Sequence, residues 1–240
     1  MKGLFFLMTI VLFTGCSTDK VQLEGTLESV LESTEIVVEN VIACAASNEN
    51  DSQVSVFFYP RDGASNFKYF ETESAEVDEN DFSSYSELEI PSKDIFNGYL
   101  KKFEVAVSEE KWVIVTFEED GKTHLSNPIR LKQITKPTEY LPQNITVDAS
   151  SENPDFSWVD GTYDDTKIYF QVISDPQQNL ISGTYTFDRM FRFYELDNVV
   201  LNITRGTPPA LKMNLSYAFT LMGVSEDNWV NQFSVISFDL

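Results

Sequence analysis

Carboxylates are the only side chains abundant enough in this sequence to suggest chemistry by number, with 38 Asp and Glu against 17 Lys and Arg. The most concentrated acidic loop holds Asp160, Asp164 and Asp165. Their oxygen atoms are ligands that Ca²⁺ prefers, but their spacing does not match an EF-hand loop. Several other loops are equally acidic, and such stretches also form ordinary polar turns. We keep the three aspartates as candidate cation ligands and expect no cofactor.

The residue types that serve most enzymes are scarce or badly placed. His124 is the single histidine, which excludes a zinc site with two His ligands. A Ser-His-Asp triad would need His124, which follows an Asp-Gly turn and is expected to be an exposed strand residue. Glycines occur singly, which excludes the common phosphate-binding loops. Cys44 lies in an apolar run and is expected to be a buried structural thiol. The sequence therefore predicts that the protein is not an enzyme.

The amino terminus carries a secretion pattern that ends at a cysteine. A lysine supplies positive charge, residues 4–13 form an apolar stretch too short to span a bilayer, and small residues precede Cys16. Residues 12–16 (LFTGC) resemble the lipobox of bacterial lipoproteins, although Phe13 stands where that family more often has Leu. The resemblance implies cleavage after Gly15 and a lipid on Cys16. An ordinary secretory signal with a coincidental cysteine is the alternative.

Such an anchor would place the protein in the bacterial cell envelope. Several acyl chains on one residue hold a protein stably at a membrane, so no transmembrane helix is needed. Ser17 follows Cys16, and it does not resemble the Asp that holds some lipoproteins at the inner membrane, so the outer membrane is preferred. The formal net charge of −21 excludes nucleic acid as a partner, because phosphates require Lys and Arg. The expected partners are the membrane, reached through the lipid, and an envelope protein or a glycan.

The elements that must position these residues are predicted to be strands. Short runs of β-branched and aromatic residues alternate with turns rich in Asp, Asn, Gly, Ser and Pro. The clearest hairpin turns at Asp120-Gly121, because both residues tolerate the positive φ angles of a tight turn. The runs are 35–46, 53–59, 66–73, 85–90, 100–107, 111–118 and 124–131 in the first half, and 145–148, 155–159, 167–174, 180–187, 190–196, 199–204, 216–224 and 230–240 in the second.

Two halves of similar style predict an all-β fold of two tandem antiparallel β-sandwiches. A stretch with two prolines and few core residues, 132–142, separates them. We expect a signal peptide over 1–15, a lipid-anchored tether over 16–34, a first sandwich over 35–134, a linker over 135–142 and a second sandwich over 143–240.

The second half resembles fibronectin type III and immunoglobulin-like domains. Residues 156–158 (FSW) are similar to the second strand of such domains, with Trp158 turned into the core. Residues 211–217 (LKMNLSY) resemble the tyrosine-corner segment, in which a Leu precedes a Tyr. The resemblance implies that Trp158, Leu211 and Tyr217 are structural core residues and that the Tyr217 hydroxyl bonds back to the backbone. The first half shows no convincing tyrosine corner and no Trp in its presumed second strand.

Three functions remain open, because this fold hosts many unrelated roles. The first is a membrane-anchored lipoprotein that acts as a non-enzymatic binding or scaffolding module in the bacterial envelope. The second is a carbohydrate-binding or weakly glycan-active surface protein, which the aromatic content and the acidic loops suggest. The third is a purely structural envelope lipoprotein.

Overall fold

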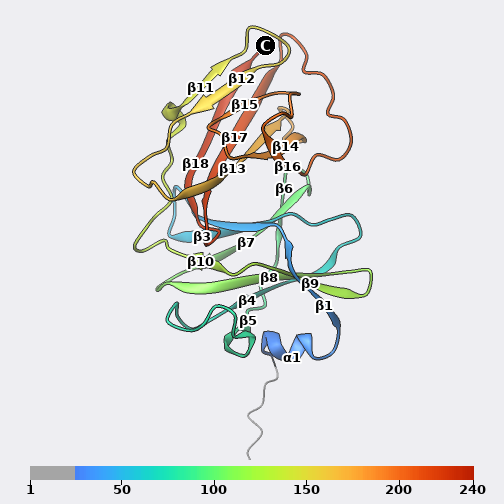
Figure 1. Ribbon diagram of the computed structural model, residues 1–240, viewed down its shortest axis with the longest axis vertical. Coiled ribbons are helices and arrows are strands. Elements are labelled where there is room, and N and C mark those ends of the chain that lie inside the picture. Colours follow the sequence, from blue (N-terminus) through green and yellow to red (C-terminus); the bar gives the residue numbers. More distant parts are fainter. Residues whose placement is uncertain (1–24) are drawn as a thin grey trace, which may run out of the picture.

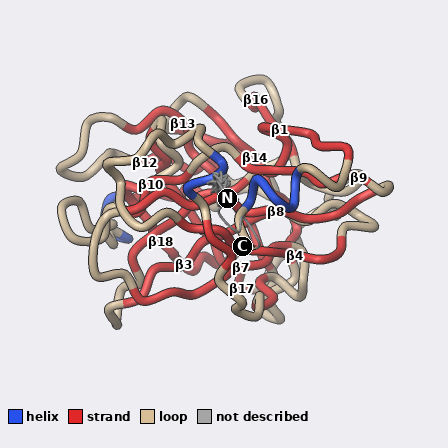
Figure 2. Tube along the Cα trace, turned by 90° about the horizontal axis from the view of Figure 1, so that it is seen from below, coloured by secondary structure: helices blue, strands red, loops and turns tan. Residues whose placement is uncertain are grey.

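The computed structural model describes residues 25–240, and nearly all the regular structure in them is β-strand (Figures 1 and 2). Cys16 and the expected signal peptide over 1–15 lie outside these residues. Figure 1 shows an elongated molecule with helix α1 (Leu27–Leu31) at one end, the C-terminus at the other and the sheets between them. The all-β fold of antiparallel sheets predicted from the sequence is confirmed.

The strands of the first half have the order of an immunoglobulin-like sandwich. The four-stranded sheet runs β2 (Ala43–Ser47), β3 (Gln53–Phe58), β7 (Leu100–Ala106) and β6 (Lys93–Ile95), which is the A-B-E-D order of constant-type domains. The six-stranded sheet runs β1 (Glu35–Val41), β9 (Lys122–Ser126), β8 (Lys111–Glu119), β4 (Ser65–Glu71) and β5 (Ser86–Glu87), with β10 (Ile129–Leu131) also paired to β8. Strands β4, β8 and β9 thereby keep the C-F-G order. A short 3-10 helix, η1 (Phe82–Ser84), precedes β5.

The second half pairs a small sheet with a larger one. The three-stranded sheet runs β11 (Ile145–Asp148), β12 (Asp155–Trp158) and β15 (Met190–Arg192). The five-stranded sheet runs β16 (Val199–Asn202), β14 (Leu180–Thr186), β13 (Thr166–Ser174), β17 (Ser216–Ser225) and β18 (Val230–Asp239). Side chains from both sheets fill one core, in which Phe156 stacks on Phe219 with ring centroids 4.0 Å apart. A 3-10 helix, η2 (Pro142–Asn144), leads into β11.

Alternation along the strands explains how the two halves meet. In β3, Val56 and Phe58 point into the first core, whereas Phe57 between them points out of that sandwich, as the period of two in a strand requires. Phe57 belongs to a separate apolar cluster that includes Phe170 and Met222 of the five-stranded sheet. The outer face of one sheet therefore covers part of the outer face of the other, and these residues are withdrawn from water.

The predicted Asp-Gly hairpin is confirmed. Asp120 and Gly121 have φ angles of 52° and 74°, the positive values that a tight turn between twisted strands needs.

Residues 35–46 depart from the prediction, because they form two strands rather than one. β1 pairs with β9 in parallel, and β2 pairs with β3 in the other sheet. The pairing register shifts between Val37 and Val41, where Glu39 has a φ of 54°, and this irregularity lets the chain change sheets.

Part of the expected tether over 16–34 is packed against the body. Thr26 caps α1, since its side chain accepts a hydrogen bond from the Ser29 backbone N–H. Leu27 is fully buried against Phe70 and Tyr85 on the six-stranded sheet. The leucine spacing that suggested a helical face is thus used for docking, and only the part of the tether before residue 25 lies outside the description.

The segment expected as a linker, 135–142, forms hydrogen bonds to both halves. The backbone N–H of Ser47 donates to Thr138 Oγ1 at 3.0 Å, and that hydroxyl donates to the Val230 carbonyl at 2.8 Å. The Tyr140 hydroxyl donates to the Ser47 carbonyl at 2.6 Å. The two prolines predicted a connection between domains, and the polar side chains between them bond across the junction.

Candidate functional site

An acidic groove of about 600 Å³ lies where the two halves meet. Trp112 lines it from the first half, and Lys167 is a basic residue on its wall. Pockets at domain junctions are common ligand sites, and an aromatic ring beside polar groups suits a polar ligand with an apolar face. The acidic side chains along the groove are Glu79, Asp165, Glu226 and Asp227.

Most of this negative charge is compensated within the protein. Asp165 accepts from Lys136 Nζ at 2.5 Å and from Asn231 Nδ2 at 2.8 Å. Burial alone would raise the pKa of the Asp165 carboxyl, but these hydrogen bonds outweigh it and lower the pKa. Asp227 pairs with Lys132, and Glu226 lies 3.9 Å from Lys167. Three of the four acidic side chains along the groove therefore lie near a lysine, which offsets much of its negative charge.

The three aspartates proposed as cation ligands have separate roles. Asp160 Oδ1 accepts a hydrogen bond from the Tyr169 hydroxyl at 2.6 Å, and Asp160 Oδ2 accepts one from the Arg189 guanidinium at 2.5 Å. Asp165 is held in the groove by Lys136, as described above. Asp164 is exposed. Within residues 25–240, no group of three or more His, Cys, Asp or Glu side chains is arranged to hold a metal ion.

His124 corrects one expectation, because it is buried rather than exposed, with 7% of its surface accessible. The parallel strand β1 runs beside β9, and its Asn40 Oδ1 lies 2.8 Å from His124 Nδ1. The Arg61 guanidinium lies 2.9 Å from the same His124 ring nitrogen, Nδ1. Arg61 also donates to Glu119 Oε2 at 2.8 Å, which lowers the pKa of the Glu119 carboxyl. Both Arg61 and the imidazole stack on Phe117.

This Arg61 cluster borders a second groove, of about 390 Å³, between the first half and the five-stranded sheet. Cys44 lines the same groove and is half-buried as a residue. Burial raises the pKa of its thiol to about 12, so the sulfur stays protonated and unreactive at neutral pH. Tyr59 also lines this groove.

The three residues proposed as structural core lie together in the second core. Trp158, Leu211 and Tyr217 are all buried there. The Lys212 backbone N–H donates to the Tyr217 hydroxyl at 2.8 Å, so the phenol is tied to the backbone of the preceding loop. Trp158 packs edge-on to Tyr169, with ring centroids 5.3 Å apart.

The Arg61 cluster and the Trp112 groove are features that the sequence did not indicate. Arg61 follows strand β3 and contacts Glu119, more than 50 positions away in the sequence. No local sequence pattern predicts such a contact. Trp112 is the second residue of β8, a segment for which the sequence predicted only a strand. Among residues 25–240, no helix is long and apolar enough to cross a membrane.

No protein-family model matches the chain, and no curated protein matches it. Among solved structures, the chain is similar to the FN1–FN3 domains of chicken CNTN1, with 12% identity, coverage of 86% of this chain and 68% of that one, and a TM-score of 0.30. It is also similar to a segment of two fibronectin type III domains from chicken tenascin, with 15% identity, coverage of 84% and 97%, and a TM-score of 0.29. The strand order described above, rather than these similarities, makes the first half immunoglobulin-like.

Proposed function

We propose that this chain is a lipid-anchored, non-enzymatic binding or scaffolding module of a bacterial envelope. It is held through Cys16, preferably at the outer membrane. The observation that carries the proposal is the position of α1 and the C-terminus at opposite ends of an elongated body (Figure 1). A lipid at Cys16 precedes α1 in the chain, so it would hold that end next to the bilayer and turn the other end outward.

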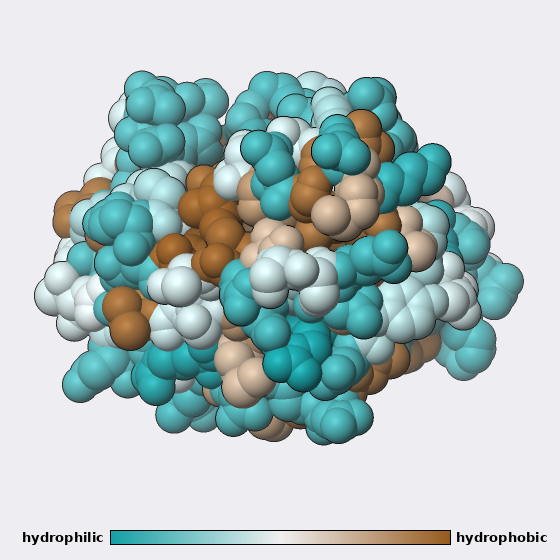
Figure 3. All heavy atoms as spheres, turned by 90° about the horizontal axis from the view of Figure 1, so that it is seen from above, coloured by the Kyte–Doolittle hydropathy of each residue, from teal (hydrophilic) through white to brown (hydrophobic). Residues whose placement is uncertain are grey.

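The outward end offers apolar surface to a partner. Met213 and Leu215 are 54% and 42% exposed, and Leu215 lies beside the C-terminus because its carbonyl accepts the Leu240 backbone N–H at 3.3 Å. Figure 3 views this end and shows apolar side chains gathered within a hydrophilic surround. Apolar groups ringed by polar ones are typical of protein interaction sites, which favours an envelope protein as the partner.

The titratable side chains in the clusters around Arg61 and Asp160 bind one another, which supports a role without catalysis. Arg61, Glu119 and His124 satisfy one another, and Asp160 binds Tyr169 and Arg189. A general acid or base must present a proton to a substrate, whereas these groups face each other. Hydrolysis of glycans or esters by the purified mature protein would overturn the non-enzymatic part of the proposal.

Anchoring is tested by the substitution Cys16→Ser in the native host. We expect the wild-type protein in the membrane fraction, with diacylglycerol on Cys16 in the mass spectrum, and the variant either unprocessed or released. Cys44→Ser is the matched control and should stay in the membrane fraction. An unmodified Cys16 thiol in the mature wild-type protein would contradict the anchor.

Binding is tested by cross-linking in intact cells, followed by purification with the lipid retained. We expect Met213→Glu to lose the main cross-linked partner, because a charge would be placed in the apolar surface. Ile134→Glu is the control. It changes a side chain that is equally exposed, at 56%, and this variant should retain the main cross-linked partner. The same partner yield in wild type and both variants would contradict a docking role for the outward end.

Trp112 favours a glycan as a second candidate ligand. It is the tryptophan that is only half-buried, whereas Trp158 and Trp229 are buried, and it lines the acidic groove. Sugars stack on exposed aromatic faces and bond to neighbouring carboxylates. Trp112→Ala should abolish binding on a glycan array, and circular dichroism should show that the variant is still folded. No binding by the wild-type protein would remove this candidate.

A further inference from the structure

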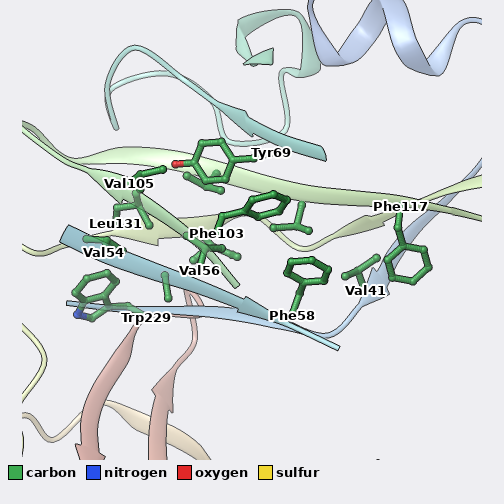
Figure 4. Close-up of a cluster of buried hydrophobic side chains, with 14 residues drawn as sticks. Val41, Val54, Val56, Phe58, Tyr69, Phe103, Val105, Phe117, Leu131 and Trp229 are labelled. Atoms are coloured by element: carbon green, nitrogen blue, oxygen red, sulfur yellow. The ribbon is translucent and has the colours of Figure 1, made fainter. Parts of the chain in front are cut away.

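The core of the first half contains a residue that the second half supplies. Trp229 lies in the turn between β17 and β18 and is completely buried. It joins a cluster whose other buried members come from residues 41–131. Figure 4 shows the indole beside Val54, carried there on strands of the second half. Indole Nε1 donates to the Lys136 carbonyl at 2.8 Å, so its polar atom is satisfied as well.

Backbone hydrogen bonds hold this turn against the first half. The Ala45 N–H donates to the Asn228 carbonyl at 3.0 Å, and the Arg130 N–H donates to the Asp227 carbonyl at 3.0 Å. Ala45 and Trp229 form an isolated β-bridge. The turn is therefore held at the end of the first sandwich, and the N–H groups of Ala45, which is buried, and Arg130 depend on it for their hydrogen bonds.

A second set of contacts between the two halves is made by the loop after β16. The Tyr99 hydroxyl donates to the Ile203 carbonyl at 2.6 Å and accepts the Arg205 N–H at 2.6 Å. The Arg205 guanidinium lies 4.6 Å from the centre of the Tyr99 ring and pairs with Asp62 at 2.8 Å. The apolar cluster that contains Phe57 and Phe170 also includes Tyr99 and Ile203, as well as Val230, the residue after Trp229.

We propose that the first sandwich is thermodynamically dependent on the second, so that the two behave as one rigid, cooperatively unfolding unit with a fixed angle between them. Opening the second half withdraws Trp229 and leaves a large void in the first core, together with unpaired N–H groups at Ala45 and Arg130. Independent domains joined by a flexible linker would lack such a shared residue. The proposal does not depend on lipid anchoring.

The test is amide hydrogen exchange of the full chain, followed peptide by peptide. Trp158→Ala damages the second core, because Trp158 belongs to an apolar cluster whose members all come from residues 145–240. We expect exchange in β3 and β8 of the first half to accelerate at least tenfold, since those amides then open together with the second half. Val159→Ala is the matched control: its side chain is 60% exposed, and it should leave both halves unchanged.

Unchanged exchange in β3 and β8, with faster exchange confined to β17 and β18, would overturn the proposal. Should Trp158→Ala fail to fold, Ile173→Val makes a milder change in the same core and the same comparison applies. Trp229→Phe gives an independent check, because it keeps an aromatic ring but removes the bond to Lys136. We expect both halves to lose protection in this variant, and loss in one half alone would contradict the coupling.

Discussion

Tyr217 shows how one residue organises a corner of the second sandwich. Its ring stacks on Phe238 in the core, with centroids 5.8 Å apart, and its hydroxyl accepts the Lys212 N–H. The ring fixes the start of β17, and the hydroxyl fixes the loop that precedes it. A buried side chain with a polar tip can do both at once, which Phe cannot.

Tyr217→Phe isolates the hydroxyl. We expect a loss of about 1 kcal/mol in the free energy of unfolding, because the Lys212 N–H loses its acceptor while the ring stays packed. Urea denaturation followed by fluorescence measures it. Tyr194→Phe is the control, since that ring is 42% exposed, and it should change stability by less than about 0.5 kcal/mol. Equal stability of the two variants would show that the corner bond contributes nothing.

Helix α1 shows how a short element is held by packing rather than by its own stability. Five residues are too few to form a helix in isolation. It persists because Leu27 enters an apolar cluster and because the Leu27 N–H donates to the Tyr85 carbonyl at 3.0 Å. The chain therefore joins the six-stranded sheet before β1 begins.

Leu27→Ala should undock this helix. Truncation of a buried Leu costs about 2–5 kcal/mol, which exceeds what one turn of helix can retain. We expect limited proteolysis to cleave between residues 25 and 34 at least tenfold faster, while β8 stays protected from hydrogen exchange. Glu32→Ala alters an exposed side chain at the end of the helix and should cleave like wild type. Unaltered cleavage of Leu27→Ala would show that the helix is not held by this side chain.

The whole molecule carries many buried groups that must stay protonated. Burial raises the pKa of the Cys44 thiol and of the Tyr140 hydroxyl to about 12, and it raises the pKa values of Tyr85 and Tyr169 as well. Ordinary values are about 8.5 for Cys and 10 for Tyr. Because the folded pKa values are the higher ones, their stabilisation is complete below the unfolded values and is lost as pH rises through the folded values.

The free energy of unfolding should therefore fall between about pH 9 and pH 12. Urea titrations at intervals across this range measure the fall. Cys44 causes the start of this fall, because an unfolded thiol ionises at a lower pH than a phenol. Cys44→Ala should therefore flatten the dependence of the free energy of unfolding on pH between about pH 9 and 10. A wild-type curve that stays level up to pH 11 would contradict the buried, protonated state of these groups.

Local pattern accounts for most of what the sequence could predict. The strands follow from alternation and turn residues, and the Asp120-Gly121 hairpin follows from backbone conformation alone. Tyr217 and Trp158 were found because their neighbours resemble a known fold. Features that depend on contacts between distant segments were missed, since nothing in residues 35–46 specifies that β1 pairs with β9 and β2 with β3. For the same reason His124 was expected to be exposed, although its ring contacts Asn40, Arg61 and Phe117.

The sharing of one indole also affects how the chain is made. About 100 residues separate the end of the first sandwich from Trp229, and a ribosome adds about 5–20 residues each second, so the first half waits roughly 5–20 s for the side chain that completes it. Over that interval the first core lacks one of its buried side chains. If the chain is exported through a membrane pore, as the proposed anchoring at Cys16 requires, late completion would delay its compaction until after passage.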